Sequence, residues 1–165
     1  RLLTLQSRVS AAYKGIMALI LKNHSQDFIS GREMDFTAYK AEYIDIHHIF
    51  PEAYCVKKGI KREKYNSIIN KTPILPATNR SIGGNAPSEY LKTILKKVNG
   101  LTENELQRRV ESHFIDYTKL KVNDFNGCFI SRAKSILNLI EKAMDKPITD
   151  RDAESTRTQF GESLM

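Results

Sequence analysis

The sequence predicts an α+β fold that is mostly helical, with one short pair of strands set among helices. Three observations predict it. Apolar residues recur at three- and four-residue steps over most of the chain, as on one face of a helix. Two short segments that end at prolines are instead typical of strands. The 165 residues, 41% of them hydrophobic, are enough for one domain with a buried core.

Amphipathic helices are expected on both sides of the strand pair. The apolar side chains of residues 1–22 fall on one face of a helix with 3.6 residues per turn. After the strands, helix begins near residue 77, breaks at Gly83-Gly84 and resumes with Pro87 in its first turn. Thr102, with a glutamate three residues later, has capping-box spacing. The helices that flank the centre of the domain are therefore expected at residues 1–22, 102–117 and 123–145, the last one capped near Asn123.

The strand pair is expected in the middle of the chain. Apolar and polar residues alternate from Tyr43 through Ile46, and Pro51 then ends the first strand, because proline cannot donate to a strand ladder. Residues 52–69 follow without a clear period. The second strand is expected at residues 72–75, although Pro73 interrupts it.

Composition restricts the class of protein. Residues 1–149 are expected to form a single domain, and residues 150–165, which are polar and show no period, a disordered tail. The chain begins with Arg1 rather than Met, which indicates a piece of a longer protein. We find no signal peptide and no apolar run long enough to cross a bilayer, so a membrane protein is not expected. Two cysteines are too few for a disulfide framework or a four-thiolate zinc site, which predicts a reducing, cytoplasmic location.

The charge balance favours a polyanionic partner. The chain has 26 basic and 19 acidic residues, a formal net charge of +7, and nucleic acid is the commonest polyanion in a cell. One basic run would contact the DNA backbone or else form a solvated face. Its members are Lys57, Lys58, Lys61, Arg62 and Lys64.

Three short signatures occur in order between residues 45 and 89. They are Ile46-His47-His48-Ile49-Phe50-Pro51, Asn70-Lys71-Thr72-Pro73 and Thr78-Asn79-Arg80-Ser81-Ile82-Gly83-Gly84. Together they resemble the HNH, or His-Me finger, nucleases. The spacing of the two asparagines is similar to that in the HNH domain of CRISPR RNA-guided nucleases. The resemblance implies a ββα-metal motif over about residues 43–98, embedded in a helical domain.

The sequence is still more similar to the C-terminal HNH-type domain of GmrSD-like restriction systems. This likeness extends to Tyr13-Lys14-Gly15-Ile16 upstream and Ser112-His113-Phe114-Ile115-Asp116 downstream. Those modification-dependent systems defend bacteria by cutting modified phage DNA, and a separate N-terminal nucleotide-hydrolysing domain precedes the nuclease. The resemblance therefore implies a DNA-cleaving effector domain that works with a nucleotide-hydrolysing domain or subunit outside this chain.

The resemblance also implies chemical roles. His48 stands at the general-base position, and an imidazole with an unperturbed pKa near 6.5 is mostly neutral above pH 7. His47 and Asn79 stand at the metal-ligand positions, and Asp45 is the alternative ligand if His47 points away. Asn70 is expected to hold a loop by hydrogen bonds, because an amide does not transfer protons usefully near neutral pH.

The metal and the substrate contacts are less narrowly defined. Many HNH enzymes have Asp at the position of His47, and a carboxylate favours Mg2+, whereas an imidazole suits Mn2+, Ni2+ or Zn2+. We expect a divalent cation, Mg2+ or Mn2+ before Ni2+ or Zn2+. Arg80 would contact a phosphate or lie on the surface. Neighbouring residues of a regular strand point to opposite faces, so His47 and His48 would serve one phosphate only where the strand ends or twists.

Two other functions are compatible with the same sequence. One is a catalytically silent nucleic-acid-binding module that keeps the nuclease scaffold. The other is a protein-interaction domain whose positive charge is incidental. Plasmid nicking separates the first from an enzyme, and the salt dependence of DNA binding separates the second from both.

Overall fold

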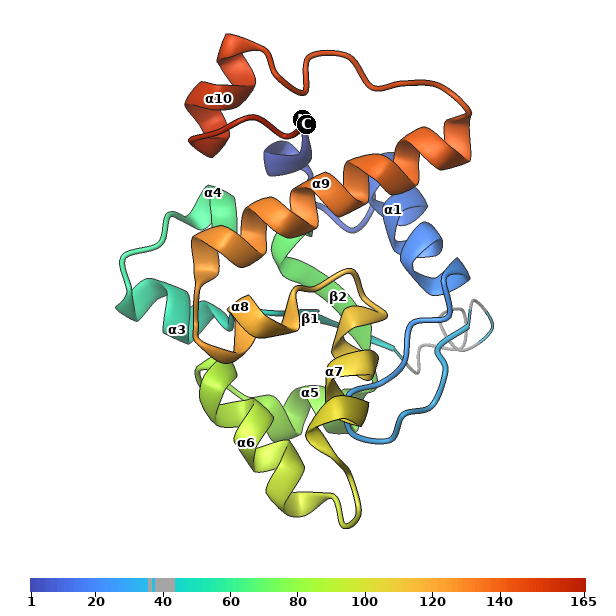
Figure 1. Cartoon of the computed structure of the whole chain (residues 1–165), viewed down its shortest axis with the longest axis vertical. Coiled ribbons are helices and arrows are strands. Elements are labelled where there is room, and N and C mark those ends of the chain that lie inside the picture. Colours follow the sequence, from blue (N-terminus) through green and yellow to red (C-terminus); the bar gives the residue numbers. More distant parts are fainter. Residues whose placement is uncertain (36, 38–43) are drawn as a thin grey trace.

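The computed structural model describes residues 1–35, 37 and 44–165, and it confirms a mostly helical α+β architecture (Figure 1). Strands β1 (Asp45–His48) and β2 (Lys71–Ile74) form an antiparallel two-stranded sheet with helices around it. The register pairs His47 with Thr72 and His48 with Lys71. The expected beginning of the first strand at Tyr43 lies outside the described residues.

Short helices connect the two strands and longer ones surround them. The segment between the strands, in which the sequence shows no period, contains helices too short to display one. The described helices are η1 (Leu2–Thr4), α1 (Ala11–Lys22), α3 (Glu52–Lys57), α4 (Arg62–Tyr65), η2 (Ile68–Asn70), α5 (Pro76–Ile82), α6 (Pro87–Lys97), α7 (Glu103–Glu111), α8 (Tyr117–Lys121), α9 (Phe125–Met144) and α10 (Glu154–Phe160).

The sequence predicted one continuous helix over residues 1–22, and this prediction is wrong. Helix α1 begins only after Ser10, whose Oγ accepts a hydrogen bond from the backbone N–H of Tyr13 at 3.2 Å. Serine favours this N-cap position because its side chain satisfies an otherwise unpaired donor. The preceding residues include η1 and an irregular stretch that crosses the sheet region, where the Ile68 N–H donates to the carbonyl of Leu5 at 2.9 Å.

Pro73 lies within β2 and does not interrupt it. It pairs with Ile46 of β1. Each strand of a two-stranded sheet has one unpaired edge, and a proline whose nitrogen faces that edge costs no ladder hydrogen bond.

Helix α9 is capped one residue later than expected. The Asp124 carboxylate accepts from the Gly127 N–H at 2.9 Å and is the N-cap. Asn123 instead adopts a left-handed conformation (φ 61°) and its side-chain oxygen accepts from the Ser88 N–H at 2.9 Å, at the beginning of α6. The asparagine therefore caps a helix that is distant in sequence.

The C-terminal segment corrects the expectation of a disordered tail over residues 150–165. It forms α10, and both Phe160 and Leu164 are buried in the hydrophobic core. Arg151 fastens the segment, because its guanidinium donates to the Leu164 carbonyl at 2.8 Å and to Glu141 of α9 at 3.0 Å. A short amphipathic helix surrounded by polar residues has too little period to be recognised from sequence.

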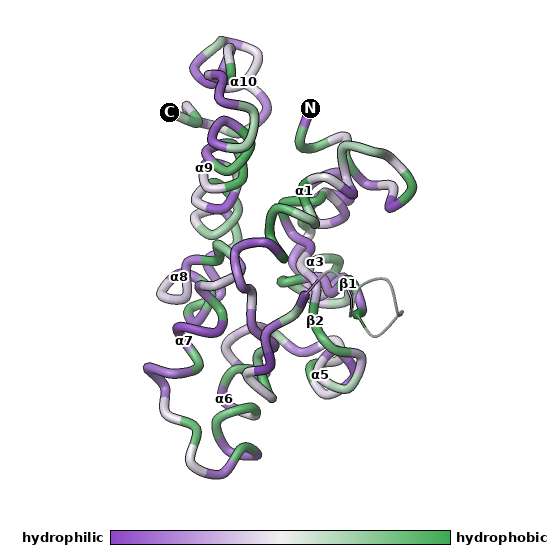
Figure 2. The backbone as a smooth tube through the Cα atoms, turned by 90° about the vertical axis from the view of Figure 1, so that its right-hand side faces the viewer, coloured by the Kyte–Doolittle hydropathy of each residue, from purple (hydrophilic) through white to green (hydrophobic). Residues whose placement is uncertain are grey.

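The chain ends and the loop between α6 and α7 lie at opposite ends of the molecule (Figure 2). The sheet lies between them, and α1 and α9 pack against each other on the side of the termini. No helix in the described part of the chain is both long and apolar enough to cross a membrane.

Arg132 of α9 is a buried charged residue in this core. Its side chain is 1% exposed, and its guanidinium donates to the carbonyls of Ile69 at 2.5 Å, Lys71 at 2.8 Å and His113 at 3.2 Å. A fourth bond, at 3.2 Å, reaches the carbonyl of Ile68. Arg132 therefore holds η2 and the beginning of β2 in place, and these segments carry Asn70 and Lys71.

Candidate functional site

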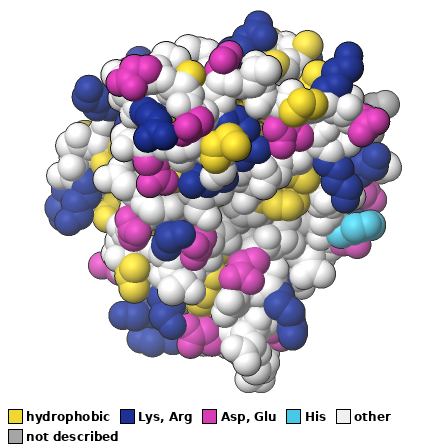
Figure 3. Space-filling model, turned by 45° about the horizontal axis from the view of Figure 1, so that its top comes forward, with side chains coloured by type: hydrophobic (Ala, Val, Ile, Leu, Met, Phe, Trp, Pro, Cys, Tyr) yellow, Lys and Arg dark blue, Asp and Glu magenta, His cyan; other side chains and the backbone are white. Residues whose placement is uncertain are grey.

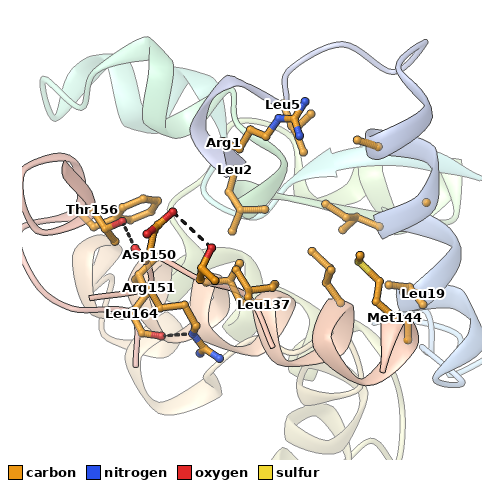
Figure 4. A pocket seen from close by; sticks show the side chains of 18 of the residues that line it. Arg1, Leu2, Leu5, Leu19, Leu137, Met144, Asp150, Arg151, Thr156 and Leu164 are labelled. Carbon is orange, nitrogen blue, oxygen red and sulfur yellow. Dashed lines mark hydrogen bonds between the residues drawn. The ribbon is translucent and has the colours of Figure 1, made fainter. Parts of the chain in front are cut away.

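One large pocket formed by the described residues lies away from the predicted site residues. It has a volume of about 890 Å³ and lies between η1, α1, α9 and the C-terminal segment. Figure 4 shows Leu2, Leu19, Leu137 and Met144 around it. None of the predicted site residues lines this mostly apolar pocket.

His47, Asn79 and Asp45 come together where β1 meets α5. The Nδ1 atom of His47 lies 2.9 Å from the Oδ1 atom of Asn79, and the Asn79 Nδ2 donates to the Asp45 carboxylate at 3.2 Å. Asp45 and His47 are two positions apart in β1, so their side chains point to the same face of the sheet. Because Asp45 can only accept from the amide nitrogen, it holds the amide oxygen toward the imidazole.

His47 is buried with one ring nitrogen unsatisfied. Its side chain packs edge-on against the ring of Tyr90 in α6, at 6.0 Å between centroids, and the residue is 3% exposed. Its Nε2 is buried without a hydrogen-bond partner among the described residues. Burial lowers the pKa of His47 from 6.5 to about 3, although the hydrogen bond with Asn79 opposes this shift. The imidazole is therefore neutral at physiological pH, as a metal ligand must be.

His48 points to the other face of the sheet, as the alternation of strand residues requires. Its Nε2 lies 3.4 Å from the Oδ1 atom of Asn66, and its ring packs edge-on against Tyr65 at the end of α4. Its pKa is lowered from 6.5, chiefly by burial and further by the positive charges of Lys71 and Arg8. His48 is the last residue of β1, so both histidines lie at the end of the strand but on opposite faces.

Asn70 makes the hydrogen bonds expected of a residue that fixes a loop. Its Oδ1 accepts from the Phe50 N–H at 2.9 Å, and its Nδ2 donates to the carbonyls of Phe50 at 3.0 Å and Tyr65 at 2.9 Å. These bonds join the segment after β1 to the segment before β2. Asn70 therefore determines how the chain leaves His48.

The predicted basic contacts lie on the surface. Arg80 is exposed on α5, one residue after Asn79. The basic run occupies α3, α4 and the loop between them, where Lys57, Lys58, Lys61 and Arg62 are exposed and Lys64 is half-buried. On the face drawn in Figure 3, basic and acidic side chains alternate without forming one large patch.

Several residues around the two histidines carried no recognisable sequence signal. Asn66 and Arg8 contact the His48 face only through tertiary structure, and Tyr90 reaches His47 from α6. Asp27 is buried and accepts hydrogen bonds from the Leu75 N–H at 3.0 Å and the Thr78 hydroxyl at 2.7 Å. It therefore positions the beginning of α5, the helix that carries Asn79.

His113 is a structural histidine that joins β2 to the loop before Asp27. Its Nε2 must donate to the Gln26 carbonyl, at 2.8 Å, so its Nδ1 accepts from the Thr72 hydroxyl, at 2.7 Å. Burial lowers the pKa of His113 from 6.5 to about 4. His24, by contrast, is exposed and pairs with Glu33.

The buried neutral His113 predicts a loss of stability in acid. A folded-state pKa below the unfolded value means that protonation favours the unfolded chain, so stability is complete above about pH 6.5 and falls as the pH drops toward 4. The difference between the two pKa values corresponds to roughly 3 kcal/mol. We expect urea unfolding of the His113→Gln variant to show a flatter pH dependence between pH 7.5 and 4.5. A variant as acid-sensitive as the wild type would contradict this role.

The comparisons with known proteins do not assign a function. No protein-family model and no solved structure matches the chain. The chain is 39% identical over 117 residues to Uncharacterized protein MJ0686 of Methanocaldococcus jannaschii. The match covers 67% of this chain and 19% of that protein, so the chain spans about a fifth of the length of this relative. The function therefore has to be inferred from the geometry of the sheet and the helix that follows it.

Proposed function

We propose that the chain is a metal-dependent DNA endonuclease domain of the HNH type, built on a ββα-metal motif formed by β1, β2 and α5. The approach of His47 to Asn79, 2.9 Å between Nδ1 and Oδ1, carries this proposal. The two residues are far apart in sequence, and the fold brings together one imidazole nitrogen and one amide oxygen. A second observation supports the proposal. The Nε2 atom of His47 is buried without a hydrogen-bond partner among the described residues, and a histidine that only fills the core would be expected to have one.

The donor set fits an open site for a divalent cation. His47 offers an imidazole nitrogen and Asn79 an amide oxygen, both of which divalent cations accept as ligands, and the two atoms lie 2.9 Å apart. In the described part of the chain, no three His, Cys, Asp or Glu side chains gather as for a metal ion. His47 and Asn79 would hold the cation with Asp45 behind the amide. The amide oxygen suits Mg2+ or Mn2+, and the imidazole suits Mn2+, Ni2+ or Zn2+.

The reaction would be hydrolysis of a phosphodiester bond. A bound cation would offset the negative charge that develops on the phosphate. His48, neutral because burial and nearby cations lower its pKa, would accept a proton from the attacking water. Since His48 faces away from His47, the substrate would have to lie across the end of β1 to contact both side chains. Asn70 would keep that end open by holding the chain that follows it.

The same proposal includes the biological setting implied by the sequence resemblance. The domain would be the effector of a bacterial anti-phage restriction system and would act in the cytoplasm. A nucleotide-hydrolysing domain or subunit outside this chain would be its partner. The support for this setting is the set of motifs and not the geometry.

The test is plasmid nicking by the purified domain with Mg2+ or Mn2+, against the same reaction with EDTA. We expect nicking that requires the metal and that falls at least about 100-fold in Asn79→Ala, because the amide oxygen is lost. Asn85→Ala is the matched control, because it removes the amide of an exposed asparagine that is not a proposed metal ligand. This variant should nick DNA as the wild type does. No cleavage with any divalent metal, or equal cleavage by Asn79→Ala and the wild type, would remove the nuclease proposal. DNA binding without cleavage would then favour a silent nucleic-acid-binding module.

A further inference from the structure

Three basic residues, Arg8, His48 and Lys71, lie near one another on the side of the sheet opposite His47. Lys71 lies directly across from His48 in the register of the two strands, so both side chains stand on the same face. Arg8 reaches this face from the irregular segment before α1, and its guanidinium donates to the Ile46 carbonyl at 3.3 Å. Lys71 donates to the carbonyl of Gln6, two residues before Arg8, and Arg8 donates to the carbonyl of Ile46, two residues before His48, so the three side chains lie near one another.

Lys71 is unusual because it is buried and forms no ion pair with any residue that the structure describes. The residue is 5% exposed, and its ammonium donates to the Gln6 carbonyl at 3.3 Å. None of the ion pairs formed by the described residues includes Lys71 or Arg8. Taking an ammonium group out of water costs several kcal/mol unless an opposite charge compensates it. The ring of Tyr13, 5.9 Å from the ammonium, offsets only part of this cost.

The neighbours that hold the basic groups in place are mostly neutral. Asn66 contacts the His48 ring through its Oδ1 and donates from its Nδ2 to the Gln6 side chain at 3.3 Å. Glu52 is the acidic residue whose charge reaches this cluster, and its carboxylate accepts from the Tyr65 hydroxyl at 3.3 Å. Among the described residues, two cations and one imidazole thus face the carboxylate of Glu52, and these groups together carry an excess of positive charge.

We propose that Arg8, His48 and Lys71 form a binding site for a backbone phosphate of DNA, on the His48 side of the sheet. The inference rests on the proposed nuclease function and adds where the substrate lies. A phosphate would supply the negative charge that Lys71 lacks, and the guanidinium of Arg8 matches the geometry of two phosphate oxygens. The exposed basic residues of α3 and α4 lie just before Asn66 in the chain. The DNA backbone on either side of the bound phosphate would contact them.

DNA binding in EDTA tests this site without any cleavage. The probe is a fluorescently labelled DNA duplex, and the readouts are the Kd and its dependence on salt. We expect Arg8→Gln and Lys71→Met each to raise the Kd about tenfold and to reduce the salt slope by about one unit. Arg108→Gln on α7 and Lys142→Met on α9 remove the same charges from exposed positions elsewhere and should change the Kd by less than about twofold.

The variants also separate a binding role from a structural one. Arg8 is exposed, so Arg8→Gln should fold even if Lys71→Met does not, and Arg8→Lys should recover part of the affinity. Wild-type affinity and salt slope in Arg8→Gln would overturn the proposal. So would inorganic phosphate that binds the wild type as tightly as the duplex does, because the cluster would then be a site for free phosphate.

The outcome is distinguishable from failure of the nuclease proposal. Duplex binding that depends on Arg8 and Lys71, in a protein that does not nick DNA with any metal, would support the phosphate site and reject the enzyme. Metal-dependent nicking with an unchanged KM in both variants would support the enzyme and reject the phosphate site.

Discussion

His48→Ala is expected to reduce the rate of plasmid nicking by a factor of roughly 10² to 10⁴, the usual contribution of a general base. The lowered pKa of His48 keeps its ring neutral at pH 7, and a neutral imidazole is the form that accepts a proton from water. Single-turnover nicking at saturating DNA measures this step apart from substrate binding. His48 is half-buried and makes one long hydrogen bond, at 3.4 Å, so the variant should fold.

His24→Ala is the matched control, because it removes an exposed imidazole far from the sheet in sequence. It should nick DNA as the wild type does. DNA binding provides a second comparison, since a base that acts mainly in the chemical step should lower kcat much more than it raises KM. Equal nicking rates in His48→Ala and the wild type would show that another group takes the proton.

Because the two histidines face opposite sides of the sheet, we expect them to have separate roles. His47 faces α5 and α6 and would bind the metal, whereas His48 faces Arg8, Lys71 and Asn66. Loss of His47 should therefore weaken metal binding, and loss of His48 should leave metal affinity nearly unchanged. Titration of Mn2+ against both variants distinguishes the two roles without reference to the rate.

Those parts of the site that lie on regular local structure could be predicted from the sequence. The alternation around Ile46, and the prolines nearby, predicted two strands in the right places. From the sequence, we expected His47 and His48 to serve one phosphate where the strand ends or twists, whereas the structure places them on opposite faces of the sheet. The pairing of Asn79 with His47 followed only from the resemblance, because no local rule relates a helix residue to a strand residue more than thirty positions away.

The rest of the site depends on tertiary contacts that leave no period in the sequence. Arg8 was part of an expected continuous helix, and it reaches the sheet only because α1 begins later, after Ser10. Lys71 belongs to the second of the three signatures, but nothing in the sequence indicated that its side chain is buried. The C-terminal segment was predicted to be a disordered tail because Phe160 and Leu164 are isolated apolar residues in a polar stretch. Their burial depends on a core that distant helices form.

The buried Arg132 should make the largest contribution of any one side chain to the stability of the site's scaffold. Replacement by methionine fills a similar volume but removes the donors of all four hydrogen bonds to backbone carbonyls. The carbonyls of Ile69 and His113 have no other backbone donor among the described residues, and each unsatisfied buried carbonyl costs about 1–3 kcal/mol. We expect the free energy of unfolding to fall by about 3 kcal/mol or more, which is a large part of the stability of a domain of this size.

Urea unfolding of Arg132→Met and of Lys142→Met measures this effect on the same helix. Lys142 is exposed on α9, so its substitution should change the free energy of unfolding by less than about 0.5 kcal/mol. Because Arg132 holds the carbonyls on both sides of Asn70, its loss should also loosen the chain that leaves His48, and hydrogen exchange of the Phe50 amide, bonded to Asn70, should become faster. An Arg132→Met protein as stable as the wild type would mean that the methionine's burial compensates for the stranded carbonyls, as happens when some buried charges are replaced by apolar groups.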